Sequence, residues 1–169
     1  MAIQHTLEAC LHVPLDRADL FPFFCDAFNL ERITPRELCF RVLTPRPIEM
    51  REGARIDYRL SLWGIPFSWQ TEISCWEPPL RFVDRQISGP YRRWEHLHEF
   101  IPGDQGTKIL DRVDYALPLS PLSECMHPLL RRQLSRIFLY RQQALKQLFC
   151  PSADTEYGVI IDGHAGEDG

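Results

Sequence analysis

The chain has 169 residues, of which 44% are hydrophobic and 25% are charged, and its formal net charge is −4. This length fits a single domain, and the mildly acidic composition argues against a nucleic-acid partner. No apolar run approaches the ~20 residues of a membrane-spanning helix, so the sequence predicts no integral membrane contact. The cysteines form no C-x-x-C pair, and the first residues lack the basic and apolar regions of a secretory signal, which predicts a cytoplasmic protein with free thiols.

The first forty residues predict a strand followed by two short helices. Residues 3–13 alternate weakly between apolar and polar side chains and end at Pro14, as an opening strand does. An aromatic-rich helix can follow in residues 16–24, limited in length by Pro22. A further helical turn in residues 28–33 ends before Pro35.

Four more strands are predicted between residues 38 and 87. Residues 38–43, 56–62 and 67–75 are strand-like, and the last two alternate with a period of two. Residues 82–87 form another strand, whose phase is ambiguous. Either Phe82, Asp84 and Gln86 or Val83 and Ile87 face inward.

Residues 89–117 predict one long β-hairpin around a Pro-Gly-Asp-Gln-Gly turn. Its apolar face would also carry three ionisable side chains, because the residues that alternate inward are Trp94, His96, His98, Phe100, Ile109, Asp111, Val113, Tyr115 and Leu117. If Phe100 pairs with Ile109, His98 lies opposite Asp111.

Residues 129–149 predict a long amphipathic helix that covers the sheet. At 100° per residue, Ser135 and Gln142 fall outside one apolar arc about 120° wide. This arc contains Leu130, Leu134, Ile137, Phe138, Ala144, Leu145 and Leu148. Arg141 projects into the middle of this apolar arc. Its guanidinium must therefore find an acceptor or reach an opening. Residues 150–169 are rich in Pro, Ser, Gly and acidic residues, which predicts a mobile acidic tail.

The predicted order of elements resembles that of the START-related, polyketide cyclase/dehydrase-like (SRPBCC) superfamily. The most specific similarities are Gly89-Pro90-Tyr91-x-x-Trp94-x-His96-x-His98-x-Phe100, Asp111-x-Val113-x-Tyr115-x-Leu117-Pro118 and Arg136-Ile137-Phe138-x-Tyr140-Arg141. The resemblance implies an α+β helix-grip fold over residues 1–149: a curved seven-stranded antiparallel sheet wraps a long C-terminal helix, with two short helices after the first strand. It also implies a cavity for a hydrophobic ligand, of a few hundred Å³, between sheet and helix.

Nine side chains are candidates for ligand binding in such a cavity: Tyr58, Trp69, Trp94, His96, His98, Asp111, Tyr115, Phe138 and Arg141. The aromatic members could equally be ordinary core residues. His98 and Asp111 could form a purely structural pair or a polar floor that orients a ligand. Arg141 could pair with Asp111 or Asp84, or bind an acidic group of the ligand.

Three classes of function remain open on these residues. The preferred one is a protein that carries or sequesters a small hydrophobic molecule. The alternatives are a cyclase or dehydratase that uses His98 and Asp111 as an acid–base pair, with Tyr115 or Arg141 polarising a carbonyl, and a protein-interaction module without a small ligand. We expect no cofactor and no metal ion, because His96, His98 and Asp111 lack a fourth ligand at a characteristic spacing.

Overall fold

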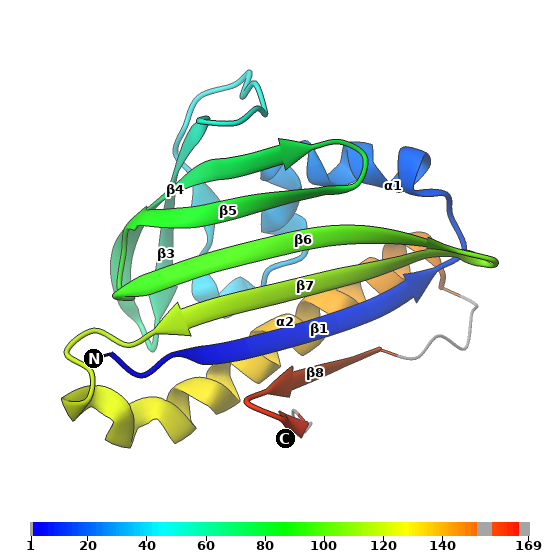
Figure 1. Cartoon of the computed structure of the whole chain (residues 1–169). Coiled ribbons are helices and arrows are strands. Elements are labelled where there is room, and N and C mark those ends of the chain that lie inside the picture. The colour runs from blue at the N-terminus through cyan, green and yellow to red at the C-terminus, as the bar shows by residue number, and fades with distance from the viewer. Residues whose placement is uncertain (1, 152–156, 166–169) are drawn as a thin grey trace.

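The computed structural model describes residues 2–151 and 157–165, which form one antiparallel sheet and several helices (Figure 1). The strand order is β2-β3-β4-β5-β6-β7-β1-β8-β9. The strands are β1 (His5–Val13), β2 (Arg41–Val42), β3 (Arg55–Leu62), β4 (Ile65–Glu77), β5 (Arg81–Ser88), β6 (Arg93–Gly103), β7 (Gly106–Ala116), β8 (Tyr157–Ile161) and β9 (His164–Ala165). The helices are α1 (Arg17–Phe24), the 3-10 helices η1 (Ala27–Arg32), η2 (Arg36–Leu38) and η3 (Leu122–Met126), and α2 (His127–Phe149).

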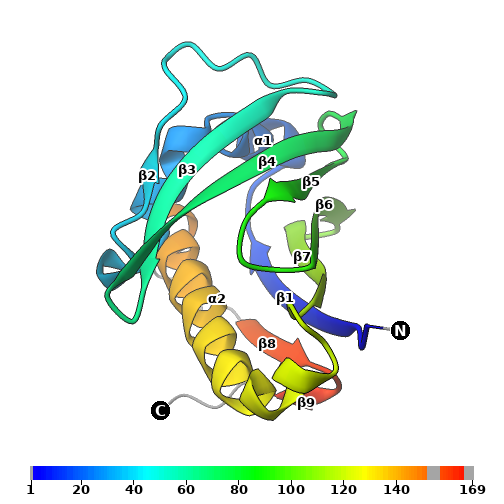
Figure 2. The same ribbon diagram turned by 90° about the vertical axis from the view of Figure 1, so that its left-hand side faces the viewer.

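The arrangement is the helix-grip fold that the sequence predicted. The sheet curves around α2, and α1 with the 3-10 helices near it closes one end of the space between them (Figure 2). The seven predicted strands correspond to β1–β7. The predicted strand number was too low, because the described part of the chain adds β8 and β9 after α2.

The β6–β7 hairpin has the register that the alternation of its two arms predicted. Phe100 pairs with Ile109, His98 with Asp111 and Trp94 with Tyr115. Trp94, His96, His98 and Phe100 are all buried, as a strand with one face toward the interior requires. The hairpin therefore presents two histidines from one strand to the concave side of the sheet.

Strand β4 bends the sheet. Its pairing with β5 shifts register between Gln70 and Thr71 and again between Ile73 and Cys75. Such irregularities bend a strand and increase its twist. Beyond this bend, β3 and β4 turn away from the rest of the sheet toward α2 (Figure 2).

Residues 157–165 belong to the sheet, which corrects the prediction of a mobile tail. Strand β8 pairs with β1, and Val159 and Ile161 are buried in a cluster with Leu7 and Leu139. The rest of the predicted tail after Pro151, residues 152–156 and 166–169, lies outside the described residues. The domain predicted to end at residue 149 therefore extends at least through β8.

The docking of β8 also explains why α2 is buried on a second face. Ser135, Leu139 and Gln142 are buried, although Ser135 and Gln142 lie outside the apolar arc of the helix. This face packs against β8, and Lys146 on the same face lies 5.6 Å from the centre of the Tyr157 ring. Helix α2 thus uses one face for the interior of the grip and another for the C-terminal strand.

The interior is divided into a packed end and an open end. Leu11, Phe21, Phe100 and Leu145 belong to a tightly packed cluster at the end of α2 near α1. Closer to the N-terminal end of α2, the side chains of the sheet and of the helix are separated by a cavity.

Candidate functional site: a cavity between the sheet and helix α2

The cavity has a volume of about 470 Å³, as expected from the sequence and within the usual range for small-molecule sites. Its helix wall is a single stripe of α2 made by Leu130, Leu134, Ile137, Phe138 and Arg141. This spacing is that of one helix face, and it spans ~16 Å from Leu130 to Arg141 at 1.5 Å per residue.

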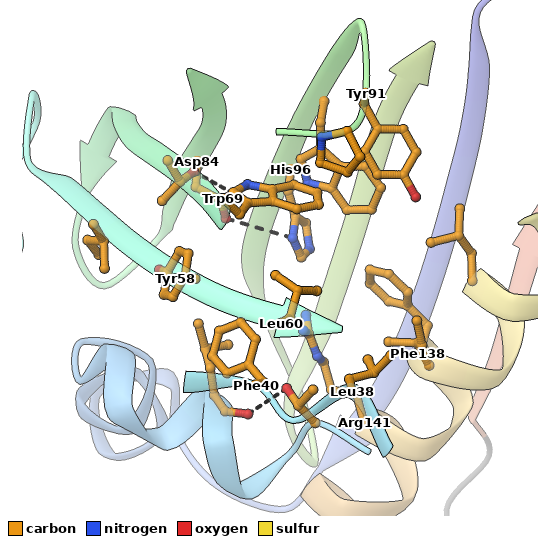
Figure 3. A pocket seen from close by; sticks show the side chains of 18 of the residues that line it. Leu38, Phe40, Tyr58, Leu60, Trp69, Asp84, Tyr91, His96, Phe138 and Arg141 are labelled. Carbon is orange, nitrogen blue, oxygen red and sulfur yellow. Dashed lines mark hydrogen bonds and ion pairs between the residues drawn. The ribbon is translucent and has the colours of Figure 1, made fainter. Parts of the chain in front are cut away.

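Aromatic side chains form much of the opposite wall (Figure 3). Tyr58 on β3, Trp69 on β4 and Trp94 on β6 line the cavity, as proposed from the sequence. The rings of Trp69 and Trp94 meet edge to face with their centres 5.2 Å apart. Edge-to-face contacts are a favourable geometry for aromatic pairs, so these rings hold each other in place.

Tyr91 is a further cavity residue, which the sequence reasoning missed. It lies in the loop between β5 and β6, where no strand alternation signals an inward side chain. The side chain of Gln86 holds this loop: its amide donates a hydrogen bond of 2.7 Å to the carbonyl of Tyr91. Tyr91 then packs against Trp94, with ring centres 4.7 Å apart.

A network of two histidines and two aspartates crosses the sheet at the cavity wall. His96 donates from Nε2 to Oδ1 of Asp111 over 2.9 Å, and His98 donates from Nε2 to Oδ2 of Asp84 over 2.9 Å. Nδ1 of His98 also lies 2.9 Å from Oδ1 of Asp111, without the alignment of a hydrogen bond. Nδ1 of His96 lies 3.7 Å from Oδ2 of Asp84, so each imidazole contacts both carboxylates.

The environment separates the pKa values of the two histidines. Burial alone would lower the pKa of His98, but the carboxylates of Asp111 and Asp84 outweigh burial and raise it. Burial and the neighbouring His98 lower the pKa of His96, and the carboxylates do not restore it. Burial alone would raise the pKa values of Asp111 and Asp84, but the histidines hold both below their ordinary values. The network therefore favours two carboxylates, a protonated His98 and a neutral His96.

Asp84 is the member of this network that the sequence reasoning did not propose for the site. The structure resolves the phase of β5, because Phe82 is buried and Ile87 is exposed. Asp84 therefore faces the cavity, where its side chain remains 20% exposed. Asp84 could have been identified from the sequence if the inward phase of β5 had been known. The sequence does not reveal this phase, because the short strand has apolar residues in both phases.

Asp111 and Tyr115, which the sequence placed among the ligand-binding residues, do not line the cavity. Asp111 is buried behind the two histidines that it contacts. The Tyr115 hydroxyl lies 3.0 Å from Nε2 of His127 on α2, and the Tyr115 ring packs beside His5. Both residues therefore stabilise the site from outside the cavity.

His5 links three elements outside the cavity. Its Nδ1 lies 2.6 Å from Oδ2 of Asp162, and its Nε2 lies 2.8 Å from Oε2 of Glu124. Strand β1 is thereby connected to η3 on one side and to the turn after β8 on the other. This connection helps to fix the C-terminal strand and the start of α2.

Three polar atoms of residues in the cavity wall make no hydrogen bond to the described residues: Nδ1 of His98, Oγ of Ser123 and Nε of Arg141. The Arg141 side chain rises from α2 into the cavity toward the sheet (Figure 3). It pairs with neither Asp84 nor Asp111, and its guanidinium carbon lies 5.0 Å from the centre of the Phe138 ring. Arg141 thus presents a positive charge to the cavity.

Asp84, His96 and His98 also have the side-chain types of a metal site, and their ligand atoms lie within 4.8 Å of one another. His5, His127 and Asp162 form a second such group. In the first group, Nε2 of each histidine already faces a carboxylate at hydrogen-bond distance. We therefore interpret this group as a hydrogen-bonded network.

The cavity lining also includes four apolar residues that are exposed or partly exposed to solvent. They are Leu62 at the end of β3, Trp63 in the β3–β4 turn, Pro118 after β7, and Met126 just before α2. Trp63 and Met126 are largely exposed to solvent. A hydrophobic molecule could therefore contact apolar side chains before it enters.

The class that the structure defines is one of fold: the chain has a helix-grip fold, and several solved structures share it. One similar solved structure is the di-domain ARO/CYC StfQ from the steffimycin biosynthetic pathway, with a TM-score of 0.67 and 16% identity over 86% of this chain and 50% of StfQ. TTHA0849 from Thermus thermophilus is similar with a TM-score of 0.65 and 19% identity, over 84% of this chain and 94% of that protein. Major latex-like protein 151 from Panax ginseng has a TM-score of 0.61 and 13% identity, over 88% and 99% of the two chains.

These identities show a common fold and leave the activity open. No family model matches the sequence, and no curated protein matches it significantly. Among the helices of the described residues, none has the length and hydropathy needed to span a membrane.

Proposed function

We propose that this protein binds a small hydrophobic molecule with at least one polar group, and carries or sequesters it. The observation that supports this most directly is the cavity itself, because about 470 Å³ remains between the sheet and α2. An interior that served only for stability would be filled by side chains, since proteins pack to the density of organic crystals. Aromatic walls with a few polar groups are the usual lining of a ligand site.

The proposed ligand-binding residues are Tyr58, Trp69, Asp84, Tyr91, Trp94, His96, His98, Phe138 and Arg141, all of which line the cavity. The fold is shared with StfQ, named as an ARO/CYC from a biosynthetic pathway, and this likeness supports a small-molecule ligand.

Native mass spectrometry of freshly purified protein tests this proposal. We expect a fraction of the protein to carry an additional mass that disappears after denaturation and organic extraction. The extract should return the same mass to protein that has been stripped and refolded. Stripped protein that binds neither the extract nor any hydrophobic probe would contradict the proposal.

A second candidate is an enzyme of the cyclase or dehydratase kind. Its acid–base element would be His98 with Asp84, because both line the cavity and are 2.9 Å apart, whereas Asp111 lies behind them. The carboxylates of Asp111 and Asp84 raise the pKa of His98, which supports a role as proton donor at the cavity wall. Conversion of the extracted ligand by the wild type, lost in His98→Asn, would favour this candidate over the carrier.

A further inference from the structure

We propose that the ligand is a hydrophobic carboxylic acid that also carries a hydroxyl group, with its carboxylate on Arg141 and its hydroxyl on Asp84. This inference rests on the proposed function, since it specifies the ligand of the same cavity. It follows from two polar groups of opposite charge that lie on opposite walls of the cavity.

Arg141 supplies the positive wall. An arginine side chain stays protonated at any physiological pH and has only hydrogen-bond donors. Its Nε is buried and unpaired with the described residues, and none of their carboxylates forms an ion pair with its guanidinium. A buried donor without an acceptor is costly, so a ligand carboxylate that accepts two hydrogen bonds from the guanidinium would remove this cost.

Asp84 supplies the negative wall. Its Oδ2 accepts a hydrogen bond from His98, and its Oδ1 lies 3.3 Å from the Thr71 hydroxyl, which also lies 3.1 Å from the Arg85 carbonyl. An ionised carboxylate has about four acceptor positions, which leaves capacity for a donor from the ligand. A hydroxyl group can donate there, whereas a second carboxylate would be repelled.

The two walls of the cavity differ in charge, so they favour different groups on a ligand. With His98 protonated and His96 neutral, the four groups of the network carry one net negative charge, which Arg141 faces from the helix across the cavity (Figure 3). A neutral apolar ligand would give neither Arg141 nor Asp84 a new partner. A simple acid would satisfy Arg141 alone, and a hydroxy acid would satisfy both.

Isothermal titration of stripped protein at pH 7 with four naphthalene compounds separates these cases: 6-hydroxy-2-naphthoate, 2-naphthoate, 2-naphthol and naphthalene. The hydroxy acid should bind most tightly, and loss of its carboxylate should weaken binding roughly 10- to 100-fold. Arg141→Met should abolish this preference and leave 2-naphthol within about threefold of its wild-type affinity. Arg132→Met changes an exposed arginine of the same helix and should have no effect on any of the four.

Asp84→Asn tests the other wall. It should reduce the ratio of affinities between 6-hydroxy-2-naphthoate and 2-naphthoate. If Arg141→Met fails to fold, the series on the wild type and on Arg141→Lys still decides, because the hydroxy acid must exceed 2-naphthol in both.

The inference is overturned if the wild type binds 2-naphthol as tightly as the hydroxy acid, or if Arg141→Met keeps the preference for acids. In those outcomes binding persists and the proposed function stands. Binding of none of the four compounds, naphthalene included, would count against both.

Discussion

His98 and Asp111 face each other across the β6–β7 ladder, with Nδ1 of His98 2.9 Å from Oδ1 of Asp111. The same carboxylate oxygen lies 2.9 Å from Nε2 of His96. A single buried acid on β7 therefore holds two imidazoles of β6 in the cavity wall. Asp111 supports the site without reaching the cavity.

The first prediction concerns the two histidines. We expect His98 to titrate above the ordinary value of about 6.5 and His96 to titrate below it, because the carboxylates stabilise the charge on His98 while burial and that charge oppose a second one. A pH series of the imidazole ¹⁵N shifts by NMR measures both. Two histidines that both titrate near 6.5 would show that the network is not formed.

The second prediction is the pH dependence of stability. The folded-state pKa values of Asp111 and Asp84 are lowered, so their contribution to stability is present above about pH 4 and is lost as pH falls further. His98 has a raised pKa, so its contribution is present below about pH 6.5 and is lost as pH rises through the folded-state value. His96 has a lowered folded-state pKa, so it reduces stability as pH falls below about 6.5. In that range the unfolded state binds a proton at His96 more readily than the folded state does.

Urea unfolding between pH 3 and pH 8 should therefore show a steep loss of stability on the acid side. Asp111→Asn should lower the free energy of unfolding at pH 7 by about 3 kcal/mol, because the protonated His98 loses a buried counter-charge. The same substitution should also make the free energy of unfolding fall less steeply as pH decreases. Asp104→Asn, in the exposed β6–β7 turn, provides the control and should change stability by less than about 0.5 kcal/mol.

The elements with strong alternation were predictable from the sequence, and the C-terminal strand was not. The inward row of β6 and β7 fixed the pairing of Phe100 with Ile109, because a slip by one residue would expose that whole row. Strand β8 has just five residues, within a segment whose glycines and acidic residues suggest disorder. What stabilises it is its pairing with β1 and its contact with Leu139 on α2, and neither is visible in the local sequence.

The candidate site was predictable where one strand carried it. His96, His98 and Trp94 alternate on β6, and Arg141 is anomalous on an apolar helix face, so each has a local signal. Asp84 and Tyr91 come from a strand of ambiguous phase and from a loop, and only the packed structure brings them to the cavity. Tyr115 shows the opposite error: an inward aromatic residue near the end of a strand can face a neighbouring element instead of the cavity.

The third prediction tests the C-terminal strand. Ile161→Ala should lower the free energy of unfolding by about 2–4 kcal/mol, because Ile161 is fully buried against Leu7, Leu139 and Val159. Ile160→Ala is the matched control, since Ile160 is 49% exposed on the other face of the same strand, and should cost less than about 1 kcal/mol. Equal, small effects in thermal and urea unfolding would mean that β8 contributes little to the fold.

The last prediction concerns the cavity. Leu60 on β3 is partly buried and points into the cavity (Figure 3), so Leu60→Trp should place the indole in the space that a ligand would occupy. Tryptophan is well tolerated in strands, and the new contacts offset the change in shape, so we expect stability within about 1 kcal/mol of the wild type. Affinity for 2-naphthol, measured by titration, should fall at least about tenfold, because the new indole occupies part of the cavity.

Leu11→Trp is the comparison for this variant. Leu11 is fully buried in the packed cluster beside Phe100 and Leu145, where no cavity can receive the larger ring. Overpacking of this kind costs about 1–3 kcal/mol, and this change is large, so thermal unfolding should separate the two variants clearly. If Leu60→Trp destabilised the protein as much as Leu11→Trp, the space between sheet and helix would be closed in solution, and a ligand would have to open it before binding.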